Sequence, residues 1–110
     1  VRSFARNLRA RAVSAVTGLP AIIAREDIGA MRRLVDGLLA SRQFDLVHAD
    51  QITMARYALQ ARRWGAKTLL DQHNATFRVL GRLAQSEHNP LKRLFLRREE
   101  RAFARYEASV

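Results

Sequence analysis

The sequence predicts an α/β fold in which short parallel strands alternate with helices. Two apolar runs, residues 44–47 and 68–70, have the composition of buried strands. Between them, residues 51–64 carry apolar side chains at three- and four-residue spacing and are followed by Gly65, a pattern typical of a helix that ends at glycine. Parallel strands need a crossover of this length, so we expect a strand–helix–strand unit.

Helices are expected on both sides of this unit. Residues 1–16 have the pattern of a basic amphipathic helix that ends before Pro20. Residues 21–23 are expected to form an extended link. A second helix is predicted over residues 28–39, with Asp27 as a candidate N-cap.

Two further helices are predicted after the second strand. One, for which an irregular helical loop is the alternative, covers residues 77–86. The other begins at His88-Asn89-Pro90, where Asn89 is suited to cap and Pro90 to the first turn, and continues towards the C-terminus. Two strands alone do not bury both faces of a parallel sheet. We therefore expect an incomplete domain, with at least one more strand before Val1 and another after Val110.

The composition limits the chain to a single domain of modest core. It has 110 residues and no cysteine, which excludes disulfide bridges and thiolate metal sites and suits a reducing compartment. No apolar run approaches the ~20 residues that a membrane-spanning helix requires.

The chain is strongly basic. Twenty lysine and arginine residues against ten aspartate and glutamate residues give a net charge of +10, which attracts nucleic acid, anionic lipid or phosphorylated substrates. In the last helix, however, glutamates interleave with the arginines, which favours a solvated and partly paired face. Aromatic side chains that would stack bases are sparse, so a nucleic-acid partner is disfavoured.

Two histidines mark the candidate site. His48 is followed by Asp50, and His73 is preceded by Asp71 and followed by Asn74. Open parallel sheets bind ligands at the carboxyl ends of their strands, so we expect both clusters to emerge at one edge. A neutral imidazole offers one hydrogen-bond donor and one acceptor, which suits a sugar hydroxyl or a departing phosphate.

Structural alternatives stay open for these residues. His73 is also placed to cap the following helix or to bind a backbone carbonyl, and Asp50 is placed to cap the crossover helix. His88 is interpreted as an exposed residue at a helix start. The histidines and aspartates of the two clusters match no metal-binding motif, so no metal is expected. A Gly-rich phosphate loop and a nucleophile elbow are both absent from the sequence.

Five segments, in this order, resemble the N-terminal domain of family 4 glycosyltransferases. They are FDLVHAD at 44–50, MARY at 54–57, LDQHN at 70–74, NPLKR at 89–93 and RYE at 105–107. The resemblance implies the GT-B architecture, in which two Rossmann-like domains face a cleft. Residues 1–110 would then be part of one Rossmann-like domain, with the best agreement over residues 44–110.

The resemblance also implies an activity and a site. Family members transfer a sugar from a nucleotide-sugar donor to an acceptor with retention of configuration. His73 stands where the family has a histidine against the donor sugar, which implies a catalytic role. The neighbouring polar residues are then expected to bind substrate: Asn74, Asp71, His48 and Asp50.

The parent enzyme would be a hexosyltransferase-type protein of glycan biosynthesis that uses a nucleotide sugar as co-substrate and no metal or other cofactor. Its acceptor would be a glycan or a lipid-linked sugar. The resemblance implies a cytoplasmic location, and the helix predicted over residues 1–16 is a candidate for peripheral contact with the inner membrane face. The family's Gly-rich loop would precede Val1 and its nucleotide-binding domain would follow Val110, so the isolated 110 residues are expected to be inactive.

Two other interpretations compete with this one. The first is a basic, non-catalytic binding module for nucleic acid or an anionic membrane surface, whose binding would weaken steeply with salt. The second is a truncated structural remnant, which is compatible with a glycosyltransferase parent.

Overall fold

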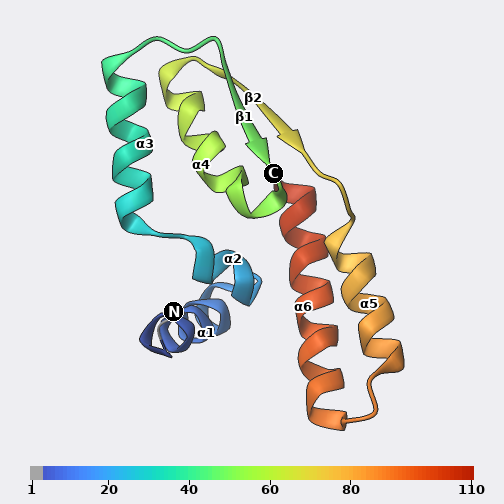
Figure 1. The fold of residues 1–110 in the computed structure, drawn as a ribbon. Helices are drawn as coiled ribbons and strands as arrows, with labels where there is room; N and C mark the ends of the chain where they lie inside the picture. Colours follow the sequence, from blue (N-terminus) through green and yellow to red (C-terminus); the bar gives the residue numbers. More distant parts are fainter. Residues whose placement is uncertain (1–3) are drawn as a thin grey trace. The chain divides into compact units, whose positions relative to one another are not determined.

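The computed structural model describes residues 4–110 as a mixed α/β protein (Figure 1). It is 72% helical and contains a two-stranded parallel sheet, so the predicted α/β class and the parallel pairing are confirmed. The elements in chain order are α1 Phe4–Thr17, α2 Ala21–Glu26, α3 Gly29–Ser41, β1 Leu46–Asp50, η1 Ile52–Met54, α4 Ala55–Gln60, η2 Ala61–Trp64, β2 Lys67–Asp71, α5 Thr76–Ser86 and α6 Pro90–Ser109.

The chain divides into two compact units. The strand unit is Glu26–His73 and holds α3, both strands and the crossover between them. The helical unit combines the chain up to Arg25 with Asn74–Val110 and holds α1, α5, α6 and nearly all of α2. The expectation of a single Rossmann-like domain stays a prediction.

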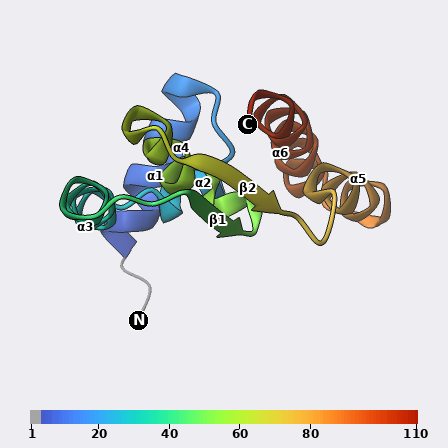
Figure 2. The same ribbon diagram turned by 90° about the horizontal axis from the view of Figure 1, so that it is seen from above.

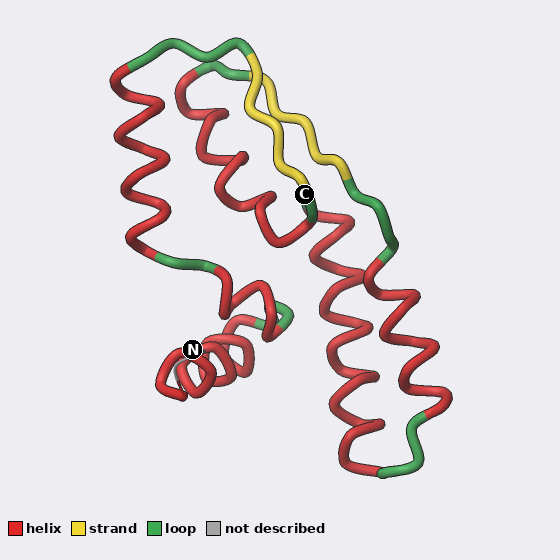
Figure 3. Tube along the Cα trace, in the orientation of Figure 1, coloured by secondary structure: helices red, strands yellow, loops and turns green. Residues whose placement is uncertain are grey.

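The strand–helix–strand unit is confirmed, with the bounds of both strands changed: the second strand covers residues 67–71 rather than 68–70. The strands pair in parallel from Leu46 opposite Lys67 to Asp50 opposite Asp71, and Figure 3 shows them as neighbouring yellow segments. The crossover consists of η1, α4 and η2, and it ends at Gly65 in the left-handed conformation with φ 77°. The first strand covers residues 46–50 rather than 44–47, because the backbone ladder continues through the polar residues after the apolar run.

The core of the strand unit lies on one face of the sheet, which α4 covers (Figure 2). Leu39, Ala61 and Ala66 are buried together, and Val35 and Val47 pack against them. Strand residues alternate between faces. The opposite face is therefore formed by exposed residues at every second position: Leu46, His48, Asp50, Lys67, Leu69 and Asp71.

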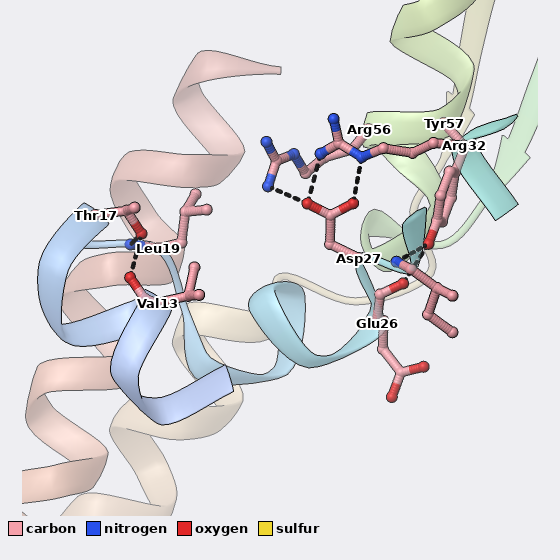
Figure 4. Close-up of polar contacts among 9 residues, drawn as sticks. Val13, Thr17, Leu19, Glu26, Asp27, Arg32, Arg56 and Tyr57 are labelled. Carbon is pink, nitrogen blue, oxygen red and sulfur yellow. Dashed lines mark hydrogen bonds and ion pairs between the residues drawn. The ribbon is translucent and has the colours of Figure 1, made fainter. Parts of the chain in front are cut away.

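The segment that leads into α3 is held by one tyrosine and one aspartate. The Tyr57 hydroxyl donates to the Glu26 carbonyl and accepts the Ile28 amide at 2.8 Å (Figure 4). Asp27 does not cap α3, whose N-cap is Ile28 without a side-chain hydrogen bond, so this prediction was wrong.

The Asp27 carboxylate instead forms ion pairs with two arginines. Arg32 contacts it through two nitrogens at 2.5 Å, and Arg56 Nη1 lies 2.9 Å away (Figure 4). This bidentate hydrogen bond raises the pKa of Arg32. The aspartate therefore joins the start of α3 to the crossover helix.

The helical unit contains a helix where an extended link was predicted. Residues 21–26 form α2, and Ile23 is only 1% exposed. Pro20 does not prevent this, because a proline is tolerated at a helix start and its carbonyl accepts the Ala24 amide at 3.0 Å. The Ala21 amide, at the first position of the helix, donates to Glu99 Oε2 at 2.9 Å.

Helix α6 also holds the ends of two other helices of this unit. Arg98 Nη2 donates to the Ser14 carbonyl near the C-terminus of α1 at 2.7 Å. Glu107 accepts the amide of Thr76, the first residue of α5, at 3.0 Å. In each case the charge has the sign that the helix dipole favours.

The helices at both ends of the chain agree with the predictions. Helix α1 covers residues 4–17 and so ends one residue beyond the predicted segment 1–16, whose residues 1–3 lie outside the described part of the chain. Helix α6 begins at Pro90, and the Asn89 side chain accepts the amides of Leu91 and Lys92. None of the helices between residues 4 and 110 has the length and apolar character to span a bilayer.

Candidate functional site at the strand edge

Three predicted site residues meet at the carboxyl ends of the two strands. Asp50 and Asp71 are the last residues of β1 and β2 and lie opposite each other in the ladder. His73 follows two residues later, and its Nε2 atom lies 3.1 Å from Asp50 Oδ1. The parallel register and the short segment after β2 thus bring together residues that are 23 positions apart.

The hydrogen bond to Asp50 defines how the His73 ring is oriented. A carboxylate only accepts hydrogen bonds, so Nε2 of His73 carries the proton that it donates to Asp50. In the neutral ring Nδ1 is then an acceptor. The side chains of His73 and Asp50 are 62% and 67% exposed, so a ligand in solution reaches both groups.

The same three residues form a group with metal-ligand chemistry. One atom from each of Asp50, Asp71 and His73 lies within 4.8 Å of the other two. Carboxylate oxygens and an imidazole nitrogen suit divalent ions such as Mn²⁺ or Zn²⁺. All three side chains are exposed, as acidic groups commonly are without an ion. The expectation that the protein uses no metal stays a prediction.

Gln51, directly after β1, has an unusual backbone. Its φ of 92° and ψ of 151° lie in a region that is essentially restricted to glycine. Two hydrogen bonds hold it there: its amide donates to the Asp71 carbonyl at 2.9 Å, and its carbonyl accepts the Met54 amide at 3.1 Å. Such strain costs about 1–3 kcal/mol and is concentrated at functional sites. A glutamine gives no sequence signal for it.

His48 shares the exposed sheet face with Asp50 but lies one strand repeat earlier, opposite Leu69. Strand geometry places residues two apart about 6–7 Å from each other. His48 is therefore at the margin of the candidate site and not in the three-residue group. Asn74 is exposed and belongs to the helical unit, and its role in substrate binding stays a prediction.

Two structural alternatives for these residues were wrong. Asp50 does not cap the crossover helix, because it belongs to the strand and Gln51 is the N-cap of η1, without a side-chain hydrogen bond. His73 does not cap α5, whose N-cap is Ala75 and whose first amide binds Glu107. His88 is exposed next to the start of α6, as predicted.

Comparisons with family models, with curated proteins and with solved structures found no match for the chain.

Proposed function

We propose that the chain is the acceptor-side part of a retaining glycosyltransferase and that its strand edge binds the sugar of a nucleotide-sugar donor. The observation that carries the proposal is the hydrogen bond between His73 and Asp50 at the carboxyl ends of a parallel strand pair. This is the position at which open α/β sheets bind ligands. The strained backbone of Gln51 at the same edge supports it.

The arrangement has the chemistry that a sugar requires. Asp50 orients the His73 ring, and the Nδ1 atom is then an acceptor for a sugar hydroxyl. Asp71 offers carboxylate oxygens to a second hydroxyl from the neighbouring strand. These groups hold the donor sugar in a reactive geometry while the nucleoside diphosphate departs.

The proposal assigns only sugar binding to the strand edge, and not the binding of the donor phosphates. The resemblance of residues 44–110 to family 4 glycosyltransferases assigns donor-phosphate binding to a Gly-rich loop and to a second domain. We therefore expect the 110-residue chain to bind a sugar weakly and to release no nucleoside diphosphate. Within this proposal the enzyme acts in glycan biosynthesis in the cytoplasm, without a metal, on a glycan or lipid-linked acceptor.

Sugar binding is tested by saturation-transfer NMR with UDP-glucose and GDP-mannose as probes. We expect saturation to be transferred from the protein to the sugar protons of at least one donor. His73→Ala should abolish it, whereas His88→Ala, which removes another exposed histidine, should retain it. Equal saturation transfer to the sugar protons in wild type and His73→Ala contradicts the proposal. Saturation transfer confined to the protons of the nucleobase also contradicts it.

Turnover is tested in the enzyme that contains this chain. His73→Ala should lower the rate of nucleoside-diphosphate release by about a hundredfold, the size typical of a lost hydrogen bond to the reacting group. Its thermal unfolding should match that of the wild type, because the side chain is exposed. A normal rate in a folded His73→Ala variant removes His73 from the site.

A further inference from the structure

We propose that the hairpin of α5 and α6 docks on an anionic lipid surface through the end that contains its turn. We call residues 79–96 of the helical unit the hairpin end. The proposal does not depend on sugar transfer, since it uses none of the strand-edge residues. It rests on exposed apolar side chains, on a groove and on uncompensated positive charge.

Large apolar side chains are exposed along one face of the first turns of α6. Leu91 is 78%, Leu94 69% and Phe95 48% exposed. Their spacing of three and four residues places them on the same side of the helix. On α5, Val79 and Leu83 are also exposed and lie one helical turn apart. Such a concentration of exposed apolar residues marks an interaction surface.

The two helices are antiparallel neighbours joined by a short turn (Figures 1 and 3). They enclose a groove of about 370 Å³ near that turn, lined by Leu83, Ser86, Glu87, Lys92, Phe95 and Leu96. Most of these residues have apolar or aliphatic side-chain surface, and Lys92 adds an ammonium group. An acyl chain beside a phosphate headgroup matches this combination.

The positive charge of the hairpin end favours an anionic lipid surface over the other possible partners. Residues 79–96 contain three basic side chains and one acidic one, a net charge of +2. A second copy of the same face would be repelled. Nucleic acid matches the charge but gains little from exposed leucines, because base recognition relies on aromatic stacking. An anionic bilayer matches both the positive charge and the exposed apolar side chains. The basic groups contact its headgroups, and the apolar side chains enter its interfacial region.

Hydrogen bonds at the turn fix the start of α6, which carries the exposed leucines. Arg93 donates from Nε and Nη2 to the Glu87 carbonyl at 3.1 and 2.9 Å, and the Glu87 carboxylate accepts the Asn89 amide at 3.0 Å. Asn89 in turn caps α6. The exposed leucines therefore sit on a defined helix start, and Leu91 and Leu94 point to solvent without a role in the core.

Vesicle flotation tests the proposal. The protein should bind vesicles of phosphatidylcholine mixed with phosphatidylglycerol and not vesicles of phosphatidylcholine alone, and added salt should weaken the binding. The double variant Leu91→Ser, Leu94→Ser should bind about tenfold more weakly, because the apolar contact is lost. Lys92→Glu should weaken binding about tenfold as well.

The matched control is Leu8→Ser, which removes an exposed leucine of α1. It should leave binding nearly unchanged. If Leu8→Ser weakens binding as much as the double variant, the docking surface is α1 and the proposal fails. Absence of binding to anionic vesicles, or binding of single-stranded RNA without vesicle binding, also overturns it. Circular dichroism of each variant checks the fold.

A reporter variant keeps the test decisive if the serine variants unfold. Trp64→Phe removes the single tryptophan, and Leu91→Trp places a new one at the hairpin end. Its fluorescence should shift to shorter wavelength when anionic vesicles are added. An unchanged spectrum in a folded reporter variant contradicts docking through α6.

Discussion

The two units use their carboxylates in different ways. In the helical unit, Glu99 and Glu107 accept the first amides of α2 and α5, and the Glu99 side chain is only 5% exposed. In the strand unit, Asp50 and Asp71 lie exposed at the ends of the strands, and Asp50 contacts the equally exposed His73. The first pair of carboxylates joins secondary-structure elements, whereas the second pair lies where a ligand can reach it.

This difference separates structural residues from candidate functional ones. A carboxylate that satisfies a helix terminus stabilises the fold by replacing a hydrogen bond to water with one to a partly buried amide. An exposed carboxylate at a strand end contributes little to stability, since solvent screens its interactions. Substitutions of the helix-capping glutamates should therefore lower the free energy of unfolding. Substitutions of the strand-end aspartates should instead affect ligand binding or turnover.

The largest effect on stability is expected for Glu99→Ala. The change leaves the Ala21 amide without its acceptor and Arg98 without its 2.5 Å partner, and it removes a carboxylate that is itself buried. Loss of a buried acceptor of this kind lowers the free energy of unfolding by about 2–3 kcal/mol. Urea denaturation measures it.

The control for this prediction is Glu99→Gln. The amide oxygen of glutamine still accepts the Ala21 amide, so about half of the loss should be recovered. If alanine and glutamine at position 99 destabilise equally, the charge towards Arg98 matters more than the cap of α2.

A smaller effect is expected in the strand unit for Tyr57→Phe. The hydroxyl joins the Glu26 carbonyl and the Ile28 amide, and its removal leaves two polar backbone groups without this partner. The free energy of unfolding should fall by about 1–2 kcal/mol, as measured by urea denaturation. If the chain belongs to the proposed glycosyltransferase, nucleoside-diphosphate release should not change, because Tyr57 is buried on the crossover helix. A large loss of turnover would argue against a purely structural role.

In contrast to Tyr57→Phe, Asp50→Asn should lower the turnover rate and leave the free energy of unfolding nearly unchanged. An amide in place of the carboxylate no longer fixes the protonated nitrogen of His73, so the ring loses its preferred orientation. Within the proposed function Asp50 is a positioning residue, so the turnover rate of the proposed enzyme should fall by about tenfold while KM changes little. The free energy of unfolding should stay within about 0.5 kcal/mol of the wild type, because the residue is exposed. A variant that loses stability and keeps its turnover would place Asp50 with the structural carboxylates.

Local signals account for the features that the sequence predicted well. Asn89 and Pro90 specify the start of α6, and Gly65 specifies the end of the crossover, because each acts within a few residues of its own position. The strand edge was also predictable, since two apolar runs separated by one helix pair in parallel and end together.

The missed features depend on residues that are distant in the sequence. The cap of α2 comes from Glu99, 78 positions later, so residues 21–23 looked like an extended link. Asp27 was expected to cap α3, but Arg56 in the crossover helix competes for its carboxylate. The strained Gln51 is enforced by the neighbouring strand. Periodicity and propensity contain no information about such partners.

The smallest predicted effect concerns pH and the turn of the hairpin end. Glu87 accepts the Asn89 amide, and this hydrogen bond lowers the pKa of its carboxyl group below the ordinary 4.5. A depressed folded-state pKa stabilises the protein above the unfolded-state pKa, and this stabilisation is lost as the pH falls through the lower folded-state value. Glu87→Gln should therefore lower the thermal midpoint slightly at neutral pH and not at a pH below the folded-state pKa, where the carboxylate is protonated in both states. Because Glu87 is only partly buried, the difference should also shrink with added salt. An equal shift at both pH values would mean that the side chain acts through packing rather than through its charge.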